Sequence, residues 1–516
     1  MPTKVFLKNI TLIVGCILSY NLFAQKMVNI SIDQQITPPL MGYNSDMSNT
    51  PKWSDIDFSN ALNKLHPNTL RYPGGSNSLY WNWQKGWTLS FSELLPFLKK
   101  YDISLEEKVI ENANTLRQLA KENRSKNSFW RQIHRYNAKT PRYNTIKEFS
   151  TAIAKTNSEA VFTLNVTTSY LEYELEMLKE AEKAGIEVKF IELGNEVYAQ
   201  NLLTAKVYPG VDNYIDTCIS WSEAIWENFP NAHIGLVCGD RNKRTKHWNE
   251  KLSKAVKNYF PKSKHTQLHF ILHYYSYFKH PKYDFNSTED YRKLIAFPKM
   301  DLKLLLERTR WDKTLYFSTW VTEFNMIENK PYEINNRWVH GLLVSSQIDQ
   351  LITQTNSEMF HYHSIGAETF PVFAALNLSD KDHNYLSPTS SGIVTSMWNR
   401  LTKNSSRFYS TKNNFQKWQI TYSPKSSSLP NNPKIQTTTE FNPIHAYVSY
   451  NTNDKAKLLV VNLSQQTVTI NIDSIFSGGE LTQYHNQPNG ISYKSTTINV
   501  STSFEIPAYS INLIEE

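Results

Sequence analysis

Eight short apolar segments between residues 41 and 365 constrain the fold of this chain more than any other feature. Stretches with helical periodicity, such as residues 220–229 and 302–311, lie between them. Repeated strand–helix units favour a parallel sheet, and eight such units favour a closed (β/α)₈ TIM barrel. The candidate strands are residues 41–47, 69–75, 160–166, 190–196, 233–239, 268–277, 315–325 and 358–365.

The chain is too long, at 516 residues, for one ordinary core. Its hydrophobic pattern also changes after about residue 401, where helical periodicity ends. Short alternating runs follow, for example at 445–451 and 457–464, which is typical of an antiparallel β-sandwich. An isolated alternating strand at residues 27–32 has no place in the barrel, so we expect it to complete the sandwich. We therefore predict an α/β chain with a leader over 1–25, an N-terminal strand over 26–36, a barrel over 37–400 and a sandwich over 401–516.

The first 25 residues have the pattern of a secretion signal. Lys4 and Lys8 flank a short apolar run, and Ala24 offers a small residue for cleavage. The run is too short and too interrupted to span a membrane. A lipoprotein signal ending at Cys16 is the less favoured alternative, because apolar residues rather than a polar tether follow it. The chain is expected to be secreted or periplasmic.

The formal net charge is +8, of which residues 1–25 contribute two, so that the remainder carries +6. This mild excess is compatible with an acidic polysaccharide partner but does not require one. The Lys and Arg residues are dispersed and form no recognition motif, so nucleic acid is not expected as a partner. Cys218 and Cys238 lie in apolar segments, and two free core thiols are favoured over a disulfide.

The segment at 190–196, FIELGNE, ends in a candidate general acid. Asn195 and Glu196 follow a short apolar strand, and the carboxyl ends of parallel barrel strands are where catalytic residues collect. A carboxyl group beside an amide suits acid–base chemistry on a substrate that carries hydroxyl groups. The same dipeptide at Asn249–Glu250 lies in a polar, helix-like run, so the strand context selects Glu196.

A second carboxylate is required for acid–base chemistry on an acetal, and Glu323 is the best candidate. It ends the apolar seventh strand segment and can face Glu196 across the barrel mouth. The same four letters, TEFN, recur at Glu440, which follows a polar run and precedes Pro443. That context favours a loop of the sandwich. The alternative for Glu196 and Glu323 is that they are ordinary ion-paired strand ends.

These motifs together resemble the clan A retaining glycoside hydrolases, in particular α-L-arabinofuranosidases and heparanase-like β-glucuronidases. The resemblance rests on LRYPGG at 70–75, LGNE at 193–196, HYYSY at 273–277 and TEFN at 322–325. It implies a barrel with a C-terminal sandwich completed by N-terminal strands. It further implies that Glu196 is the acid/base, Glu323 the nucleophile and Asn195 a ligand of the hydroxyl next to the anomeric carbon. Arg71 is then expected near the nucleophile, and Tyr275 hydrogen-bonded to it.

The residues themselves support part of this assignment. His273 and Tyr275 are two apart on a strand, so both point the same way, into the barrel mouth or into a core. Arg71 precedes a Pro-Gly-Gly turn that bends the backbone over the strand end, although a surface arginine would look the same. Asn44 and Asp46 end the first strand segment and are further candidate substrate-binding residues.

Two aromatic or histidine positions bear on sugar recognition. Trp81 belongs to an aromatic cluster just after the turn, which is either a sugar platform or a cover for the barrel top. Clan A often has a tryptophan on the eighth strand, where this chain has His361 and His363. One of them, with His363 as the candidate for substrate binding, replaces the tryptophan and leaves the identity of the bound sugar open.

The predicted function is a secreted retaining glycoside hydrolase acting on a poly- or oligosaccharide through two glutamates. No metal or organic cofactor is expected, because no His/Cys spacing indicates one. The alternatives are a transglycosylase with the same residues and a non-catalytic carbohydrate-binding protein. The sugar, the linkage, endo or exo action and the oligomeric state do not follow from the sequence.

A basic insertion over residues 88–143 follows the second strand segment and contains a predicted helix at 104–123. It emerges on the catalytic face and could attract an acidic or sulfated polysaccharide. The alternative is a solvated helical face that only lengthens a loop. Its cationic residues include Lys99, Lys100, Lys121, Arg124, Lys126, Arg131 and Arg135.

Overall fold

The structure is a computed structural model that describes most of the chain between residues 27 and 516. The described ranges are 27–103, 139–199, 203–239, 247–278, 287–309, 318–328, 334, 337–366, 374–378, 386–422, 436–472 and 475–516. The expected leader over 1–25, including Cys16, lies outside them. So do the predicted helix at 104–123 and the basic residues from Lys121 to Arg135.

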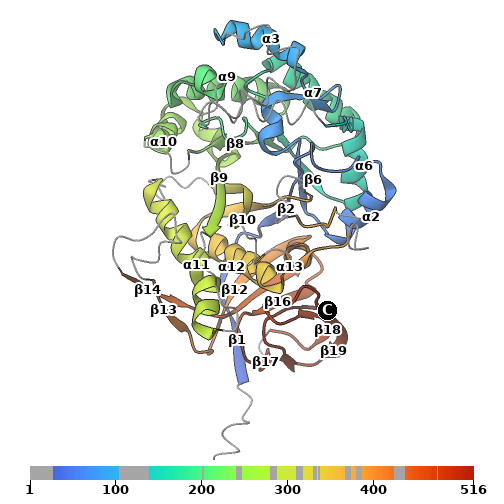
Figure 1. Ribbon diagram of the computed structural model, residues 1–516, viewed down its shortest axis with the longest axis vertical. Coiled ribbons are helices and arrows are strands. Elements are labelled where there is room, and N and C mark those ends of the chain that lie inside the picture. Colours follow the sequence, from blue (N-terminus) through green and yellow to red (C-terminus); the bar gives the residue numbers. More distant parts are fainter. Residues whose placement is uncertain are drawn as a thin grey trace, which may run out of the picture.

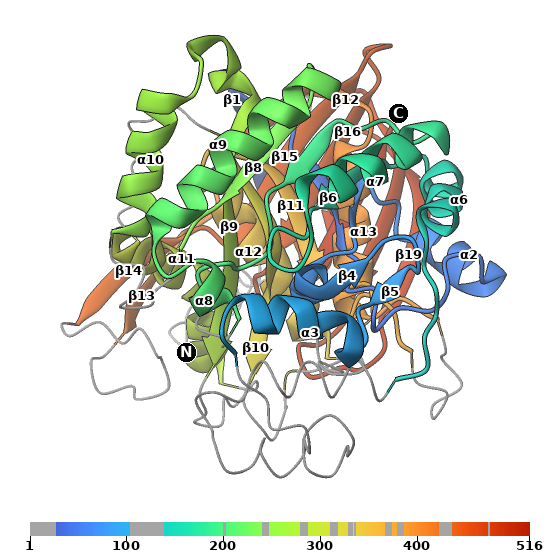
Figure 2. The same ribbon diagram turned by 90° about the horizontal axis from the view of Figure 1, so that it is seen from above.

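Eight parallel strands close into a barrel, as predicted (Figure 2). In chain order they are β2 (Leu40–Asn44), β3 (Thr69–Tyr72), β6 (Glu159–Thr163), β7 (Phe190–Glu192), β8 (His233–Val237), β9 (Leu268–Phe278), β10 (Ser318–Glu328) and β11 (Ser357–His363). Side chains fill the barrel interior, where Val161, Phe190, Trp320 and Met359 form a buried cluster. The interior is therefore a packed core, and the chemistry must lie above it.

Helices surround the barrel (Figures 1 and 2). They are α2 (Ile56–Lys64), α6 (Ile146–Thr156), α7 (Leu171–Lys183), α9 (Val211–Asn228), α10 (Trp248–Tyr259), α11 (Thr288–Arg308), α12 (Trp338–Gln354) and α13 (Ser390–Thr402). Amphipathic helices such as α6 bury one face. Helix α6 begins after Thr145, whose side chain caps it by accepting from the backbone amide of Glu148. By contrast, α12 and α13 are buried nearly all round, because they lie between the barrel and the second domain.

The second domain is a nine-stranded β-sandwich in the order β19-β18-β21-β16-β15-β12-β1-β17-β20. The N-terminal strand β1 completes it, as predicted, and lies among the C-terminal strands in Figure 1. It pairs antiparallel with β12 and parallel with β17. Val28 and Ile30 on β1 alternate with exposed residues and enter the sandwich core. The strands are β1 (Met27–Ile36), β12 (Ser405–Asn413), β15 (Ile444–Asn451), β16 (Ala456–Asn462), β17 (Val468–Asn471), β18 (Gly479–His485), β19 (Lys494–Val500), β20 (Ser503–Ile506) and β21 (Ser510–Glu515).

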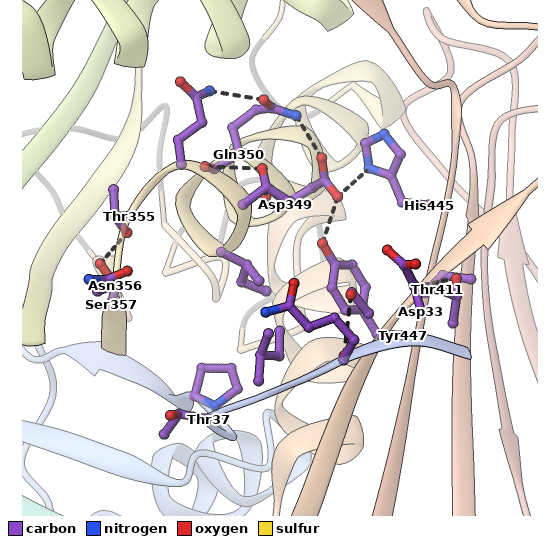
Figure 3. Close-up of a pocket in the computed structure, with 18 of the residues that line it drawn as sticks. Asp33, Thr37, Asp349, Gln350, Thr355, Asn356, Ser357, Thr411, His445 and Tyr447 are labelled. Atoms are coloured by element: carbon purple, nitrogen blue, oxygen red, sulfur yellow. Dashed lines mark hydrogen bonds and ion pairs between the residues drawn. The ribbon is translucent and has the colours of Figure 1, made fainter. Parts of the chain in front are cut away.

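Buried polar contacts join the two domains. The Tyr447 hydroxyl of β15 donates to Asp349 of α12 at 2.8 Å, and His445 faces the same carboxylate at 3.3 Å (Figure 3). These residues line a cavity of about 1260 Å³ that also reaches Ser318 and Ser357, the first residues of β10 and β11. The cavity therefore lies at the N-terminal end of the barrel, opposite the end where the candidate carboxylates are expected.

A separate hairpin of β13 (Trp418–Tyr422) and β14 (Thr437–Phe441) packs against α11, where the Tyr422 hydroxyl donates to the Lys293 carbonyl. Glu440 lies on β14 and forms an ion pair with Lys417. The expectation that Glu440 occupies a sandwich loop is therefore wrong. The β-branched run of threonines before it favours a strand.

Cys218 and Cys238 are both buried and free, as favoured from the sequence. Among the described residues, none of the helices is long and apolar enough to cross a membrane.

Candidate active site

Glu323 reaches the barrel mouth because of an irregularity in β10. Trp320 faces the barrel interior beside Phe190, and strict alternation would turn Thr322 inward next. The pairing of β10 with β9 shifts between Trp320 and Glu323, so that Glu323 rather than Thr322 is in register with His273. One additional residue in a strand re-aims the following side chain in this way.

Four side chains contact the Glu323 carboxylate. Oε1 accepts from Arg71 Nη1 at 2.8 Å and from Asn44 Nδ2 at 2.9 Å. Oε2 accepts from the Tyr275 hydroxyl at 2.7 Å and lies 3.5 Å from His273 Nδ1. The predictions that Arg71 lies near this carboxylate and that Tyr275 bonds to it agree with these contacts. The carboxylate is held in one orientation by side chains from three strands, β2, β3 and β9.

Arg71 is buried completely and links Glu323 to two further residues. Its Nε and Nη2 donate to Glu192 Oε2 at 2.8 and 2.6 Å. Nη2 also donates to Asn195 Oδ1 at 2.8 Å. This contact fixes the amide of Asn195 and directs its nitrogen away from the guanidinium.

Glu196 lies on the turn after β7, at the more open side of the site. Gly194 and Glu196 both have positive φ, at 91° and 43°, and Gly194 leaves no room for a Cβ between Val166 and Val197. The Glu196 side chain is 32% exposed, whereas that of Glu323 is 6% exposed. His273 Nδ1 lies 3.0 Å from Glu196 Oε1 and thus bridges the two glutamates.

The two carboxylates are close together. One oxygen of Glu196, one of Glu323 and a ring nitrogen of His273 all lie within 4.8 Å of one another. The structure thus brings together the two glutamates, whose sequence positions are more than a hundred residues apart.

The surroundings favour an ionised Glu323. Burial alone would raise its pKa, but the positive charges around it hold the pKa well below the ordinary value. His273 and Arg71 supply these charges, and Tyr275 adds a hydrogen bond. Burial works against a charged His273, but the carboxylates of Glu323 and Glu196 outweigh it and hold the pKa of His273 above its usual value.

His363, and not His361, reaches the site. Asn44 Nδ2 lies 2.7 Å from His363 Nδ1 while it also donates to Glu323. Because an amide nitrogen only donates, Nδ1 accepts and the ring proton is on Nε2. His361 is fully buried deeper in the barrel, where Nε2 lies 2.8 Å from Thr69 Oγ1.

Asp46 and Trp81 occupy packed positions. Both oxygens of Asp46 accept from side-chain amides, those of Asn49 and Asn77, so it ties the loop after β2 to the loop after β3. Trp81 is 3% exposed, and its indole nitrogen donates to the Tyr72 hydroxyl at 3.0 Å. Its burial favours a cover for the barrel top over a sugar platform.

The trio of Glu196, His273 and Glu323 has a spacing that could hold a metal ion. However, N–H and O–H donors already point at both oxygens of Glu323, where a cation would need free lone pairs. The guanidinium of Arg71 at 2.8 Å adds a positive charge beside that carboxylate. The donor set therefore suits an ionised carboxylate that is free to react, and it does not suit a metal ligand.

Glu192 is the site residue that the sequence analysis missed. It is fully buried, and besides Arg71 it accepts from the Thr163 hydroxyl at 3.1 Å. A signal was present, because an acid two residues after Phe190 on an apolar strand points into the barrel and needs a buried cation there.

The fold is similar to that of solved glycoside hydrolases. An arabinofuranosidase matches over 95% of this chain and 99% of its own, with a TM-score of 0.60 and 14% identity. The GH51 α-L-arabinofuranosidase from Thermotoga petrophila RKU-1 matches over 96% and 100%, with a TM-score of 0.57 and 15% identity. A family 44 xyloglucanase from Paenibacillus polymyxa matches over 95% and 99%, with a TM-score of 0.53 and 13% identity.

No protein-family model matches the sequence, and a search of the curated proteins finds no match. The structural neighbours nevertheless include members of families 51 and 44, both in clan A. The predicted resemblance to clan A is therefore confirmed at the level of the fold, together with the barrel and the C-terminal sandwich.

Proposed function

We propose that the protein is a retaining glycoside hydrolase in which Glu323 is the nucleophile and Glu196 the acid/base. The separation of the carboxylates carries this proposal. Retaining enzymes hold the two groups about 5–5.5 Å apart, whereas inverting enzymes leave about 6.5–9.5 Å for a water molecule. One oxygen of Glu196 and one of Glu323 lie within 4.8 Å of each other, which supports the shorter separation.

In the first step Glu323 attacks the anomeric carbon as the bond to the leaving oxygen breaks. Glu196 donates its proton to that oxygen, and the sugar becomes an ester of Glu323. The more exposed position of Glu196 suits contact with the departing group, which must leave the site. Asn195, oriented by Arg71, offers its amide nitrogen to the neighbouring sugar hydroxyl.

In the second step water replaces the leaving group. Glu196, now without its proton, removes a proton from the water, whose oxygen attacks the anomeric carbon. The ester bond breaks, and Glu323 regains its charge beside Arg71 and Tyr275. Two inversions give overall retention.

The product's configuration tests this proposal. On the first aryl glycoside that the protein cleaves, proton NMR during early turnover should show the anomer with the substrate's configuration. The neighbours are arabinofuranosidases and a xyloglucanase, so the screen should begin with α-L-arabinofuranosides and β-glucosides. An inverted first product would overturn the mechanism, and binding without cleavage across the screen would favour a carbohydrate-binding protein. Transfer to an added acceptor in preference to water would indicate a transglycosylase.

The acidic-polysaccharide hypothesis rests mainly on residues outside the described ranges and stays a prediction. In the described part of the site, His363 lies beside Asn44, on the strand where clan A often has a tryptophan. A histidine N–H can donate to the carboxylate of a uronic acid, so the screen should also include β-glucuronides.

Activity should fall at low pH as Glu323 becomes protonated, which gives the acidic limb of the pH profile. Tyr275→Phe should move this limb to higher pH. The Tyr275 hydroxyl stabilises ionised Glu323, so removing it raises the pKa of a carboxyl whose pKa is otherwise held low. Activity is lost as the pH falls through that pKa, so the loss should begin at higher pH, by about one unit for one charged hydrogen bond. The measurement is kcat/KM against pH on an activated aryl glycoside, with Tyr259→Phe, exposed at the end of α10, as the control. An unmoved acidic limb would contradict the assignment of that limb to Glu323.

A further inference from the structure

We propose that Glu192 is a positioning residue that shares Arg71 with the nucleophile and so lets Glu323 serve both as nucleophile and as leaving group. The inference rests on the proposed function and deepens it. Glu192 does not touch the substrate, because it is fully buried inside the barrel below the reacting carboxylate.

The contacts of Arg71 are divided unequally. Glu192 Oε2 accepts two of its N–H groups, from Nε at 2.8 Å and Nη2 at 2.6 Å. Glu323 Oε1 accepts one, from Nη1 at 2.8 Å. Glu192 therefore holds the guanidinium with two hydrogen bonds, whereas Glu323 receives one.

This division matters because the nucleophile must gain and lose a bond to carbon in one catalytic cycle. A carboxylate paired with a full positive charge in a dry site is strongly stabilised, which weakens it as a nucleophile and improves it as a leaving group. The negative charge of Glu192 offsets Arg71 and keeps Glu323 between these extremes. The other charged or titratable groups facing Glu323 are Glu196, His273, Tyr275 and His363.

A purely structural role is the alternative. A buried ion pair can simply hold β3 against β7, and its loss would then disturb both chemical steps alike. The two roles differ in how they affect formation and breakdown of the glycosyl-enzyme.

Glu192→Gln separates them. Formation of the intermediate, measured as the inactivation rate with an activated 2-deoxy-2-fluoroglycoside, should slow by at least about tenfold. Breakdown, measured as the reactivation rate of the trapped enzyme, should be unchanged or faster. The acidic limb of kcat/KM should move to lower pH. The matched control is Glu174→Gln, another buried glutamate, which accepts from the Asn165 amide at 3.1 Å and should leave both rates and the limb in place. Equal slowing of both steps with an unmoved limb would overturn the proposal.

Thr163→Val gives an effect of opposite sign with less risk to folding. It removes the hydroxyl that donates to Glu192 Oε2 at 3.1 Å, so Glu192 holds Arg71 more strongly. Glu323 then receives less stabilisation, and the acidic limb should shift slightly to higher pH. A shift in the same direction as Glu192→Gln would contradict the proposal.

A stability cycle tests the coupling without any substrate. In the wild type, Glu323→Gln leaves Arg71 paired with Glu192, whereas in the Glu192→Gln background it leaves a buried guanidinium without a counter-charge. The loss of Tm caused by Glu323→Gln should therefore be clearly larger in the second background. Additive losses would overturn the proposed sharing of Arg71. If the wild type forms no trapped intermediate while the cycle shows the coupling, the proposed function has failed and the sharing of Arg71 has not.

Discussion

Glu323→Gly should abolish hydrolysis, with a loss of roughly 10⁴–10⁶-fold in kcat, the range found when a covalent nucleophile is removed. The glycine leaves a space where the carboxylate was. The side chains of Arg71, Asn44 and Tyr275, which donated to that carboxylate, then have no anion to bind. Azide, a small anion, fits such a site and can attack the anomeric carbon directly. Added azide should therefore restore turnover of an activated aryl glycoside and give a glycosyl azide of inverted configuration.

The matched control for this variant is Glu440→Gly. It changes the glutamate of the same four-letter motif, but Glu440 is exposed on β14 and contacts Lys417. Its activity should remain at the wild-type level, with no effect of azide. An inactive Glu440→Gly enzyme, or a Glu323→Gly enzyme that azide rescues with retention, would show that the nucleophile is misassigned.

The strands of the barrel could be predicted because each is a local apolar run, and the two glutamates because they follow such runs. Their exact placement could not. Glu323 faces the site only because β10 has one residue more than β9 between the pairs Trp320–Ile271 and Glu323–His273. Such a bulge has no clear local signature in this sequence. The strand segment predicted at 190–196 likewise ends earlier, at Glu192, so that Asn195 and Glu196 lie on the turn after it.

Roles that depend on distant partners were the least predictable. Glu192 and Arg71 are 121 residues apart, and neither sequence neighbourhood shows that a buried cation and a buried acid will meet. Asp46 and Trp81 look like ligands for a sugar because of their residue types and their loops, whereas their hydrogen bonds to Asn77 and Tyr72 hold the loops together. Residue type indicates possible chemistry, but the partner decides the role.

Glu196→Ala should give a loss that depends on the leaving group. A dinitrophenol leaves without protonation, so formation of the intermediate on a dinitrophenyl glycoside should change little. An unactivated sugar or alkyl leaving group requires the proton, and its kcat/KM should fall by about 10²–10⁴-fold, the usual contribution of general acid catalysis. The distinguishing measurement is a plot of log kcat/KM against leaving-group pKa, which should be far steeper for the variant than for the wild type.

Breakdown of the intermediate should also slow in Glu196→Ala, because no base activates water. Azide needs no base and should intercept the glycosyl-enzyme from the side on which Glu196 stood, giving a glycosyl azide of retained configuration, opposite to the product from Glu323→Gly. Glu250→Ala is the control, since Glu250 follows an asparagine in the same way but is paired with Lys254 on the surface of α10. The opposite azide products follow from the two glutamates standing on opposite faces of the anomeric carbon. If both variants gave the same azide anomer, the roles assigned to Glu196 and Glu323 could not both be correct.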